Sequence, residues 1–423
     1  MRVRRALVGC MLVLVPSMVF AAPRDGGCSW PLKFDVDTLN AAFPDRNATY
    51  WLTRFVAAPG TELEITGTYP RARYMSFHVY DELQHPVDSL ADIELEPDAG
   101  SLNRFSTPGA AEGGTYTARV VFTPRPSQRA RNTIYAGTTD LDTANPSGFL
   151  IYRVYVPDDA SSPEGSVPLP SVTVRAAGSG AGLGSIELCE PGPPSTGGAA
   201  NHAIKESSFP NAIPRQVPWP PAQNPPRFVR FYSTEGAFLD RFPPNAVNDA
   251  VPRSKGGYLS NQHIAYLYAL ISRQYGDVFV FRAQAPRAPD TRSAAEVTDE
   301  ADVRYWSVCH NEFVTQRFVE CAADFEVALD PDGYFTFVIS DPDDRPSNAT
   351  ADHGVTWLPW GGAYYDGTVI YRHMLPGAAF PEAIQNVPEG VSPAAVMGEY
   401  FPRAAYCDKA RFEAGGAGAC FGP

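Results

Sequence analysis

The stretch Asp302-Val303-Arg304-Tyr305-Trp306-Ser307-Val308-Cys309-His310-Asn311, followed by a second cysteine at Cys321, decides how this chain is interpreted. An earlier stretch, Arg73-Tyr74-Met75-Ser76, has the same order of arginine, tyrosine, large apolar residue and serine. Two copies of one such unit indicate a tandem duplication, and the fold is then expected to contain the unit twice.

The register of the surrounding residues favours this duplication. The arginines of the two motifs, Arg73 and Arg304, are 231 positions apart, and the segments Phe149–Arg153 and Thr368–Arg372 resemble each other as closing strands. The second copy therefore has an insertion of 15 residues, which falls in the polar loop 288–303. Three earlier pairs are each 216 positions apart and align without a gap: Tyr50 with Tyr266, Gly60 with Gly276, and Pro70 with Pro286.

Short apolar segments separated by turn residues predict the fold class. Leu63–Thr66 and Tyr116–Thr123 alternate between apolar and polar residues, and Phe149–Val156 is a strong strand candidate. Asp332-Gly333 is a tight-turn signal before the apolar segment Tyr334–Ser340. We expect a mainly all-β protein with tandem antiparallel β-sandwich or jelly-roll-like domains and a few short helices.

Two segments are predicted to be helical. The shorter one lies near Asp37 to Phe43. The longer one begins at Ser260, a good N-cap residue, and ends at Gly276. Its apolar residues recur at helical spacing: Ile264, Leu267, Tyr268 and Ile271.

The N-terminus has the layout of a secretory signal peptide. Three arginines in the first five residues precede an apolar run, and Val19-Phe20-Ala21 offers a cleavage site, so residues 1–21 are predicted to be removed. That run is too short for a comfortable membrane span, and no later run is apolar enough, so no transmembrane segment is expected. The predicted location is secreted or periplasmic.

Length and composition predict two domains. We expect a first β-sandwich domain over 28–189, a linker rich in proline and glycine over 190–226, and a second, related β-sandwich domain over 227–423. The net charge of -13 excludes general nucleic-acid binding, because no basic stripe is present to meet phosphates. The oligomeric state is not determined by these features.

Six cysteines remain after removal of the signal peptide, and an even number in an exported chain indicates disulfides. Six cysteines allow fifteen pairings. Proximity in the sequence favours Cys309 with Cys321 and Cys407 with Cys420, which leaves Cys28 with Cys189.

Four arginines occupy equivalent positions in apolar strands of the two copies: Arg73 corresponds to Arg304, and Arg153 to Arg372. Burying an arginine is costly unless a carboxylate or carbonyl meets it, so these residues indicate either an internal tie or a site for a ligand anion. The candidate internal partners are Asp81, Asp324 and Asp341. Trp357 and Trp360 add an aromatic loop, which indicates either a sugar-binding platform or burial. The candidate ligand-binding residues are Arg73, Arg153, Arg304, Trp306, Arg372, Trp357 and Trp360.

The common catalytic motifs are absent from the sequence. Gly178-Ser179-Gly180 lacks the strand-to-helix setting of a nucleophile elbow, and no phosphate-binding loop, dinucleotide fingerprint or paired-histidine zinc helix is found. No cofactor is predicted, and the catalytic residues are unknown. Weak metal-ligand candidates are His310, His353, Asp341 and Asp343, none of which has a diagnostic spacing.

Several segments resemble an uncharacterised group of exported bacterial proteins. They are Arg304–Cys309, Asp341-Pro342, Arg345–Asn348, Trp357–Gly361 and Arg372–Pro376. The segment Arg71–Asp81 also resembles β-sandwich domains of unknown function in which an aromatic-Ser-aromatic strand ends in Tyr-Asp. These resemblances imply an exported, β-rich architecture and no particular chemistry.

The sequence thus favours a non-catalytic binding or envelope-associated protein. Its ligand is expected to be a small molecule or glycan at the domain interface or the aromatic loop. The alternative is a secreted, hydrolase-like enzyme acting on a polar or anionic substrate such as a carbohydrate. In that case His310 or His353 acts as base, and Arg304 or Arg372 stabilises negative charge.

Overall fold

The computed structural model describes residues 29–40, 42–110, 112–186, 222–239, 255–293, 295–312, 316–361 and 364–422. The predicted signal peptide, most of the predicted linker, and both Cys28 and Cys189 lie outside these residues. Within the described residues no helix is long and apolar enough to cross a membrane.

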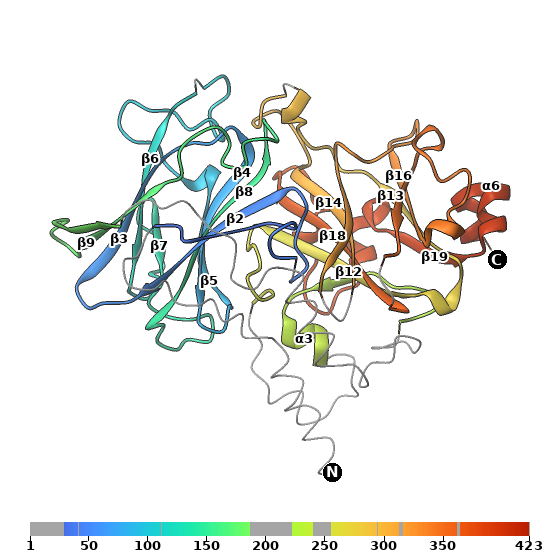
Figure 1. Cartoon of the computed structure of the whole chain (residues 1–423), viewed down its shortest axis with the longest axis horizontal. Helices are drawn as coiled ribbons and strands as arrows, with labels where there is room; N and C mark the ends of the chain where they lie inside the picture. Colours follow the sequence, from blue (N-terminus) through green and yellow to red (C-terminus); the bar gives the residue numbers. More distant parts are fainter. Residues whose placement is uncertain are drawn as a thin grey trace, which may run out of the picture.

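The described part of the chain forms four β-sheets, two from residues 32–186 and two from residues 229–407, here called the first and second halves (Figure 1). The sheets of the first half have the orders β1-β2-β8-β4-β5 and β10-β9-β3-β6-β7. Their strands are β1 (Leu32–Phe34), β2 (Ala48–Val56), β3 (Thr61–Thr68), β4 (Ala72–Asp81), β5 (Pro86–Ala91), β6 (Thr115–Val121), β7 (Thr133–Tyr135), β8 (Ser147–Pro157), β9 (Ser171–Ala176) and β10 (Gly182–Ile186).

The sheets of the second half have the orders β11-β12-β18-β14-β15 and β17-β16-β13-β19. Their strands are β11 (Val229–Phe231), β12 (Ile264–Ser272), β13 (Val278–Gln284), β14 (Val303–Glu312), β15 (Phe318–Ala323), β16 (Tyr334–Ser340), β17 (Val355–Pro359), β18 (Asp366–Pro376) and β19 (Arg403–Cys407). The short helices are α3 (Thr234–Leu239), α5 (Pro393–Met397), α6 (Lys409–Phe421), η1 (Asp92–Glu94), η2 (Arg273–Tyr275), η3 (Thr291–Ser293), η4 (Pro342–Asp344), η5 (Ala351–His353), η6 (Ile384–Asn386) and η7 (Gly398–Tyr400).

The two halves share one strand order. Strands β2, β8, β4 and β5 correspond in position to β12, β18, β14 and β15, and β9, β3, β6 and β7 correspond to β19, β13, β16 and β17. Even the parallel pairings correspond, because β6 pairs in parallel with β7 and β16 with β17, whereas the other named strand pairs are antiparallel. A duplicated unit predicts such an order. The mainly β, sandwich-like fold class expected from the sequence is confirmed.

The central strands are buried on both faces. Met75 and Phe77 of β4 pack into the core of the first half, whereas Tyr74 and Tyr80 pack into a cluster that also contains Tyr305 of the second half. The sheets β1-β2-β8-β4-β5 and β11-β12-β18-β14-β15 therefore each cover their own sandwich with one face and meet the opposite half with the other, as Figure 1 shows for β2, β4 and β8 facing β12, β14 and β18. Burial on both faces explains why these strands lack a simple apolar-polar alternation.

Both predicted helices are wrong. Residues Ile264–Ser272 form strand β12, which pairs with β18 along its whole length. Its most buried side chains, including Leu267 and Ile271, recur at every second residue and enter the core of the second half. Near residue 37 the chain turns instead, because the Asp35 side chain accepts hydrogen bonds from the backbone N–H groups of Asp37 and Thr38.

Two predicted disulfides are confirmed. Cys309 and Cys321 join neighbouring strands β14 and β15, and Cys407 and Cys420 join β19 to helix α6. The predicted pair of Cys28 with Cys189 falls outside the described residues and stays a prediction.

Candidate functional site

The two arginines of the repeated motif are exchanged between the halves. Arg73 of the first half donates to Asp324 of the second half, with Nη1 2.5 Å from Oδ1. Arg304 of the second half reaches Asp92 of the first half, with Nη1 3.3 Å from Oδ1. Each aspartate directly follows an edge strand, β5 or β15, so the two ties are equivalent.

The same aspartates also hold the motif strands of their own halves. Asp92 accepts the backbone N–H of Met75 at 2.9 Å, and Asp324 accepts that of Trp306 at 3.2 Å. Burial raises the pKa of Asp92 to about 6, although the nearby arginine opposes this. Each carboxylate therefore joins a strand of its own half to an arginine of the other half.

A second pair of arginines makes reciprocal contacts with backbone carbonyls. Arg153 donates to the carbonyl of Leu259 and, at 2.5 Å, to the hydroxyl of Tyr80. Arg372 donates to the carbonyl of Phe43 at 2.8 Å. Leu259 and Phe43 have φ values of 52° and 55°, an uncommon region for large side chains. The backbone at Leu259 and the backbone at Phe43 thus each present one carbonyl to an arginine of the opposite half.

These contacts bury the four arginines and Trp306, which the sequence suggests as candidate ligand-binding residues. The exposed fractions of Arg73, Arg153, Arg304 and Arg372 are 0%, 2%, 8% and 3%, and Trp306 donates its indole N–H to the Pro286 carbonyl at 2.8 Å. Each arginine is therefore contacted by the opposite half, while Nε and Nη2 of Arg73, Nε of Arg153 and Nη1 of Arg372 have no hydrogen-bond partner among the described residues.

Of the three partners predicted for the arginines, only Asp324 meets one of them. Asp341 instead pairs with Arg273, whose Nη2 is 2.6 Å from its Oδ1, and Asp81 faces His85. Sequence reasoning missed Asp92, which lies in a helical turn after a strand and carries no motif of its own.

The aromatic loop is also covered by other side chains. Trp360 is 2% exposed, and the guanidinium of Arg273 lies 5.1 Å from its ring centroid. Trp357 is half-buried, donates its indole N–H to Ser340 Oγ at 3.0 Å, and lies under the guanidinium of Arg345. Neither ring forms an open sugar-binding platform.

The predicted metal-binding residues are not among the groups of potential metal ligands in the described part of the chain. His310 is buried with Nδ1 3.0 Å from the Pro359 carbonyl, and burial lowers its pKa to about 4. His353 is exposed, with Nδ1 2.8 Å from Thr350 Oγ1, and Asp343 is exposed in η4. Among the described residues, the hydrogen bonds of these histidines and of Arg304 and Arg372 go to other partners.

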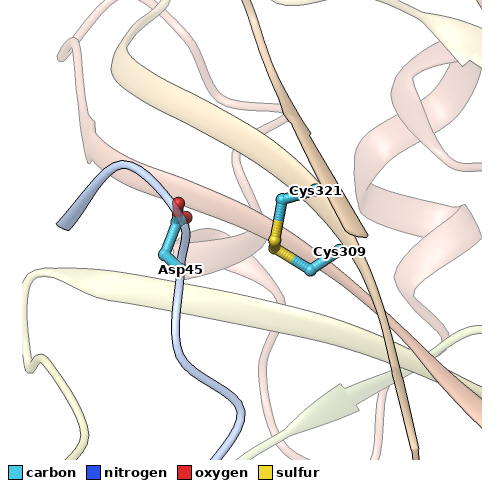
Figure 2. A group of neighbouring side chains, drawn as sticks. All are labelled: Asp45, Cys309 and Cys321. Carbon is cyan, nitrogen blue, oxygen red and sulfur yellow. A yellow bond between two sulfur atoms is a disulfide. The ribbon is translucent and has the colours of Figure 1, made fainter. Parts of the chain in front are cut away.

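Two other groups of potential metal ligands do come together in the described residues. Figure 2 shows the first, in which Asp45 lies beside Cys309 and Cys321. Both sulfurs are consumed by the disulfide, and the Asp45 carboxylate accepts from the hydroxyls of Tyr305 and Ser307 at 2.9 and 2.7 Å. This group is therefore a structural cluster, because a metal needs the thiolate form of cysteine.

The equivalent place at the other end of the interface holds two histidines that sequence reasoning missed, His78 of the first half and His263 of the second. His263 has Nδ1 2.6 Å from the Tyr74 hydroxyl and Nε2 3.1 Å from Ser89 Oγ. Its ring centroid lies 4.8 Å from that of His78, whose Nδ1 is 3.1 Å from Ser76 Oγ. Burial lowers the pKa of His263 to about 3 and that of His78 well below the usual value, so both rings are neutral at pH 7.

The repeat register contained a signal for this histidine cluster. His78 precedes Cys309 by 231 positions, and Ser89 precedes Cys321 by 232. His78 pairs with Ser89 across β4 and β5 as Cys309 pairs with Cys321 across β14 and β15. The Ser89–His263 contact is not a catalytic triad, because the other ring nitrogen meets a tyrosine rather than a carboxylate and the serine is buried.

A groove on the second half offers accessible polar and aromatic groups. It lies between the outer face of β13 and β16 and helix α6, with a volume of about 910 Å³. The helix is broken at Gly415 and Gly416, which also line or adjoin the groove. The accessible side chains that matter chemically are Arg282, Tyr334, His353, Arg403 and Phe421.

Comparison with known proteins shows no characterised family. No family model and no curated protein matches the chain. Among solved structures, the chain is similar to an uncharacterised protein from Burkholderia cenocepacia, with a TM-score of 0.49, 13% identity, and coverage of 93% of this chain and 86% of that chain. A structural-genomics protein from Vibrio parahaemolyticus has a TM-score of 0.40 and 13% identity, covering 87% of this chain and 92% of that chain.

Proposed function

We propose that the protein is an exported, non-catalytic binding or envelope-associated protein that holds a small polar molecule or glycan in the groove beside α6. The observation that carries the proposal is the contrast between the interface and the groove. The interface arginines are buried and engaged by the protein itself, whereas the groove leaves Arg403 and His353 exposed and Tyr334 half-buried.

Export is supported by the arginine-rich, apolar N-terminus and by the disulfides. Two disulfides within the second half fit an oxidising compartment such as a periplasm or the cell exterior. The arginine ties fix the two sandwiches against each other, which provides a rigid support for a surface site.

The chemistry of the groove suits a hydroxyl-rich ligand. The guanidinium of Arg282 lies 4.7 Å from the centroid of the Tyr334 ring, and that of Arg403 lies 5.0 Å from the Phe421 ring. Because each guanidinium occupies one face of its ring, the groove would bind a sugar mainly through its polar groups, with guanidinium and carboxylate groups binding the hydroxyls. The volume is within the range of small-ligand pockets.

The test is binding of the purified protein to an array of neutral and acidic mono- and oligosaccharides, followed by calorimetry with any sugar retained. Arg403→Ala and Tyr334→Ala are expected to weaken binding at least about tenfold, a loss of about 1.4 kcal/mol. Arg131→Ala, a matched exposed arginine in the first half, is expected to leave it unchanged. Equal affinity in all variants, or no sugar retained by the array, contradicts the proposal.

A further inference from the structure

A buried histidine surrounded by carboxylates lies where the two halves meet. Asp81 ends strand β4 and His85 lies just before β5, while Asp140 comes from a neighbouring turn of the first half. Ligand atoms of Asp81, His85 and Asp140 all lie within 4.8 Å of one another. Glu235 of helix α3 approaches from the second half, with Oε1 3.2 Å from His85 Nε2.

The imidazole is held in place but lacks well-formed hydrogen bonds. His85 is 6% exposed, its ring stacks on Tyr258 with centroids 5.3 Å apart, and its backbone N–H donates to Asp81 Oδ1 at 2.9 Å. Neither ring nitrogen makes a hydrogen bond of good geometry to any described residue, although Asp81 Oδ2 lies 3.5 Å from Nδ1. A buried ring whose two nitrogens face carboxylates without well-formed hydrogen bonds has the surroundings of a bound cation, which is either a proton on the ring or a metal ion.

Asp140 adds a carboxylate oxygen without a hydrogen-bond partner to the cluster. Its Oδ2 accepts the backbone N–H of Lys255 at 2.7 Å, whereas its Oδ1 is buried without a hydrogen-bond partner in the described residues. Asp81, Asp140 and Glu235 therefore place three carboxyl groups around one imidazole. Bringing such like charges together away from water is costly unless a cation joins them.

At the matching positions of the second half, the carboxylate is paired with an arginine and no metal ion is needed to balance its charge. Glu312 follows Asp81 by 231 positions and Arg317 follows His85 by 232. There the carboxylate faces a permanent cation, since Arg317 Nη2 lies 3.6 Å from Glu312 Oε1. The first half has an imidazole at this position instead, and imidazole is a common metal ligand.

We propose that Asp81, His85 and Asp140, with Glu235 beside them, form a binding site for one first-row divalent cation of the Zn²⁺ or Mn²⁺ class. One imidazole nitrogen with several carboxylate oxygens suits such ions, whereas Ca²⁺ and Mg²⁺ favour oxygen ligands throughout. The ion would join the first half to helix α3 of the second half. The proposal is independent of the sugar-binding groove, which lies elsewhere on the second half.

A proton competes with a metal ion for the ring nitrogen of His85. Burial alone would lower the pKa of His85, but the carboxylates of Asp81 and Glu235 outweigh it and raise the pKa to about 9. A metal ion must therefore displace a proton from the ring, and its binding should release one.

The test uses full-length protein freed of metal with a chelator and then dialysed. Zn²⁺ binding is measured by calorimetry, and Co²⁺ binding by its visible absorption. We expect one equivalent to bind and to raise the thermal midpoint of unfolding. His85→Arg, which copies Arg317, should retain the fold and lose the bound equivalent, and Asp140→Asn should weaken binding at least about tenfold.

His353→Ala, which removes an exposed histidine far from the cluster in the chain, should bind as the parent protein does. Stoichiometric binding that survives both His85→Arg and Asp140→Asn places the ion elsewhere and overturns the proposal. Absence of Zn²⁺ and Co²⁺ binding by the parent protein also overturns it and assigns His85 as a protonated partner of the carboxylates. If His85→Arg fails to fold, Asp140→Asn alone decides between these outcomes.

Discussion

The interface between the halves is built twice from matching residues, yet its two ends differ at the positions of Cys309 and Cys321. At one end Cys309 and Cys321 form a disulfide beside Asp45, and at the other His78 and Ser89 occupy the matching strand positions beside His263. The arginine ties occur at both ends, so they position the halves. The positions that differ, Cys309 and Cys321 at one end and His78 and Ser89 at the other, are all buried. At the first end a disulfide makes burial possible, and at the second end neutral histidine rings form hydrogen bonds. The first end should thus respond to loss of the disulfide and the second to acid.

Removing a shared arginine tie should have the largest effect. Asp324→Ala removes the buried carboxylate that Arg73 contacts most closely and leaves only Asp290, 3.6 Å from Nη2, so the free energy of unfolding is expected to fall by about 3 kcal/mol. Asp92→Ala should cost less, because its contact with Arg304 is longer and Arg304 also donates to the carbonyl of Arg73. Urea unfolding measures both. Changes within about 0.5 kcal/mol, as at ordinary surface sites, would contradict the structural role.

Removing the disulfide at the first end should have an intermediate effect. Cys309 and Cys321 are 12 residues apart, and a closed loop of that size stabilises a protein by about 3 kcal/mol. The double variant Cys309→Ala with Cys321→Ala should therefore lower the midpoint of urea unfolding while leaving the acid sensitivity described below intact. The matched control replaces Cys407 and Cys420, which lie away from the interface. A midpoint equal to that of the parent protein would show that this end does not depend on the disulfide.

Acid should weaken the other end gradually. His263 is neutral in the folded protein because its pKa is lowered to about 3, whereas its unfolded pKa is about 6.5. The unfolded state therefore binds the proton first, and the stability contributed by the neutral ring is lost as the pH falls below about 6.5. One such histidine contributes a slope of up to about 1.4 kcal/mol per pH unit.

The variant His263→Asn places at this position the residue found at the matching position, Asn47. Between about pH 6 and pH 4 it should reduce the slope of unfolding free energy against pH by about 1.4 kcal/mol per pH unit, the contribution of one proton. Unfolding free energies measured by urea at a series of pH values give the slope directly. His78, His310 and His373 also have lowered pKa values, so part of the slope should persist. An unchanged slope would show that His263 is already accessible to protons in the folded protein.

Much of the fold follows from local sequence patterns, but strand β12 does not. Ile264, Leu267 and Ile271 fit a helical spacing, and only the burial of alternate residues against β18 shows that the segment is a strand. That pairing joins residues about a hundred positions apart, so no local pattern contains it. The register of 216 that aligned Tyr50 with Tyr266 was the better guide, since both residues lie in corresponding strands.

The candidate site was less predictable for a related reason. The arginines and the need for a partner could be recognised from their place in apolar strands, and Asp324 was among the expected partners. The exchange itself could not be recognised, because Arg73 and Asp324 are 251 residues apart and meet only when the halves dock. The His85 cluster likewise depends on docking, since Glu235 comes from the opposite half.

The most direct test of the central claim is a double-mutant cycle between Arg73 and Asp324. Urea unfolding is measured for the parent protein, Arg73→Met, Asp324→Leu and the double variant. If the arginine is a tie between the halves, each single change is strongly destabilising, and the double variant recovers a coupling energy of about 2 kcal/mol. Additive effects of the two changes would contradict the exchange and would return Arg73 to the ligand-binding role first considered for it.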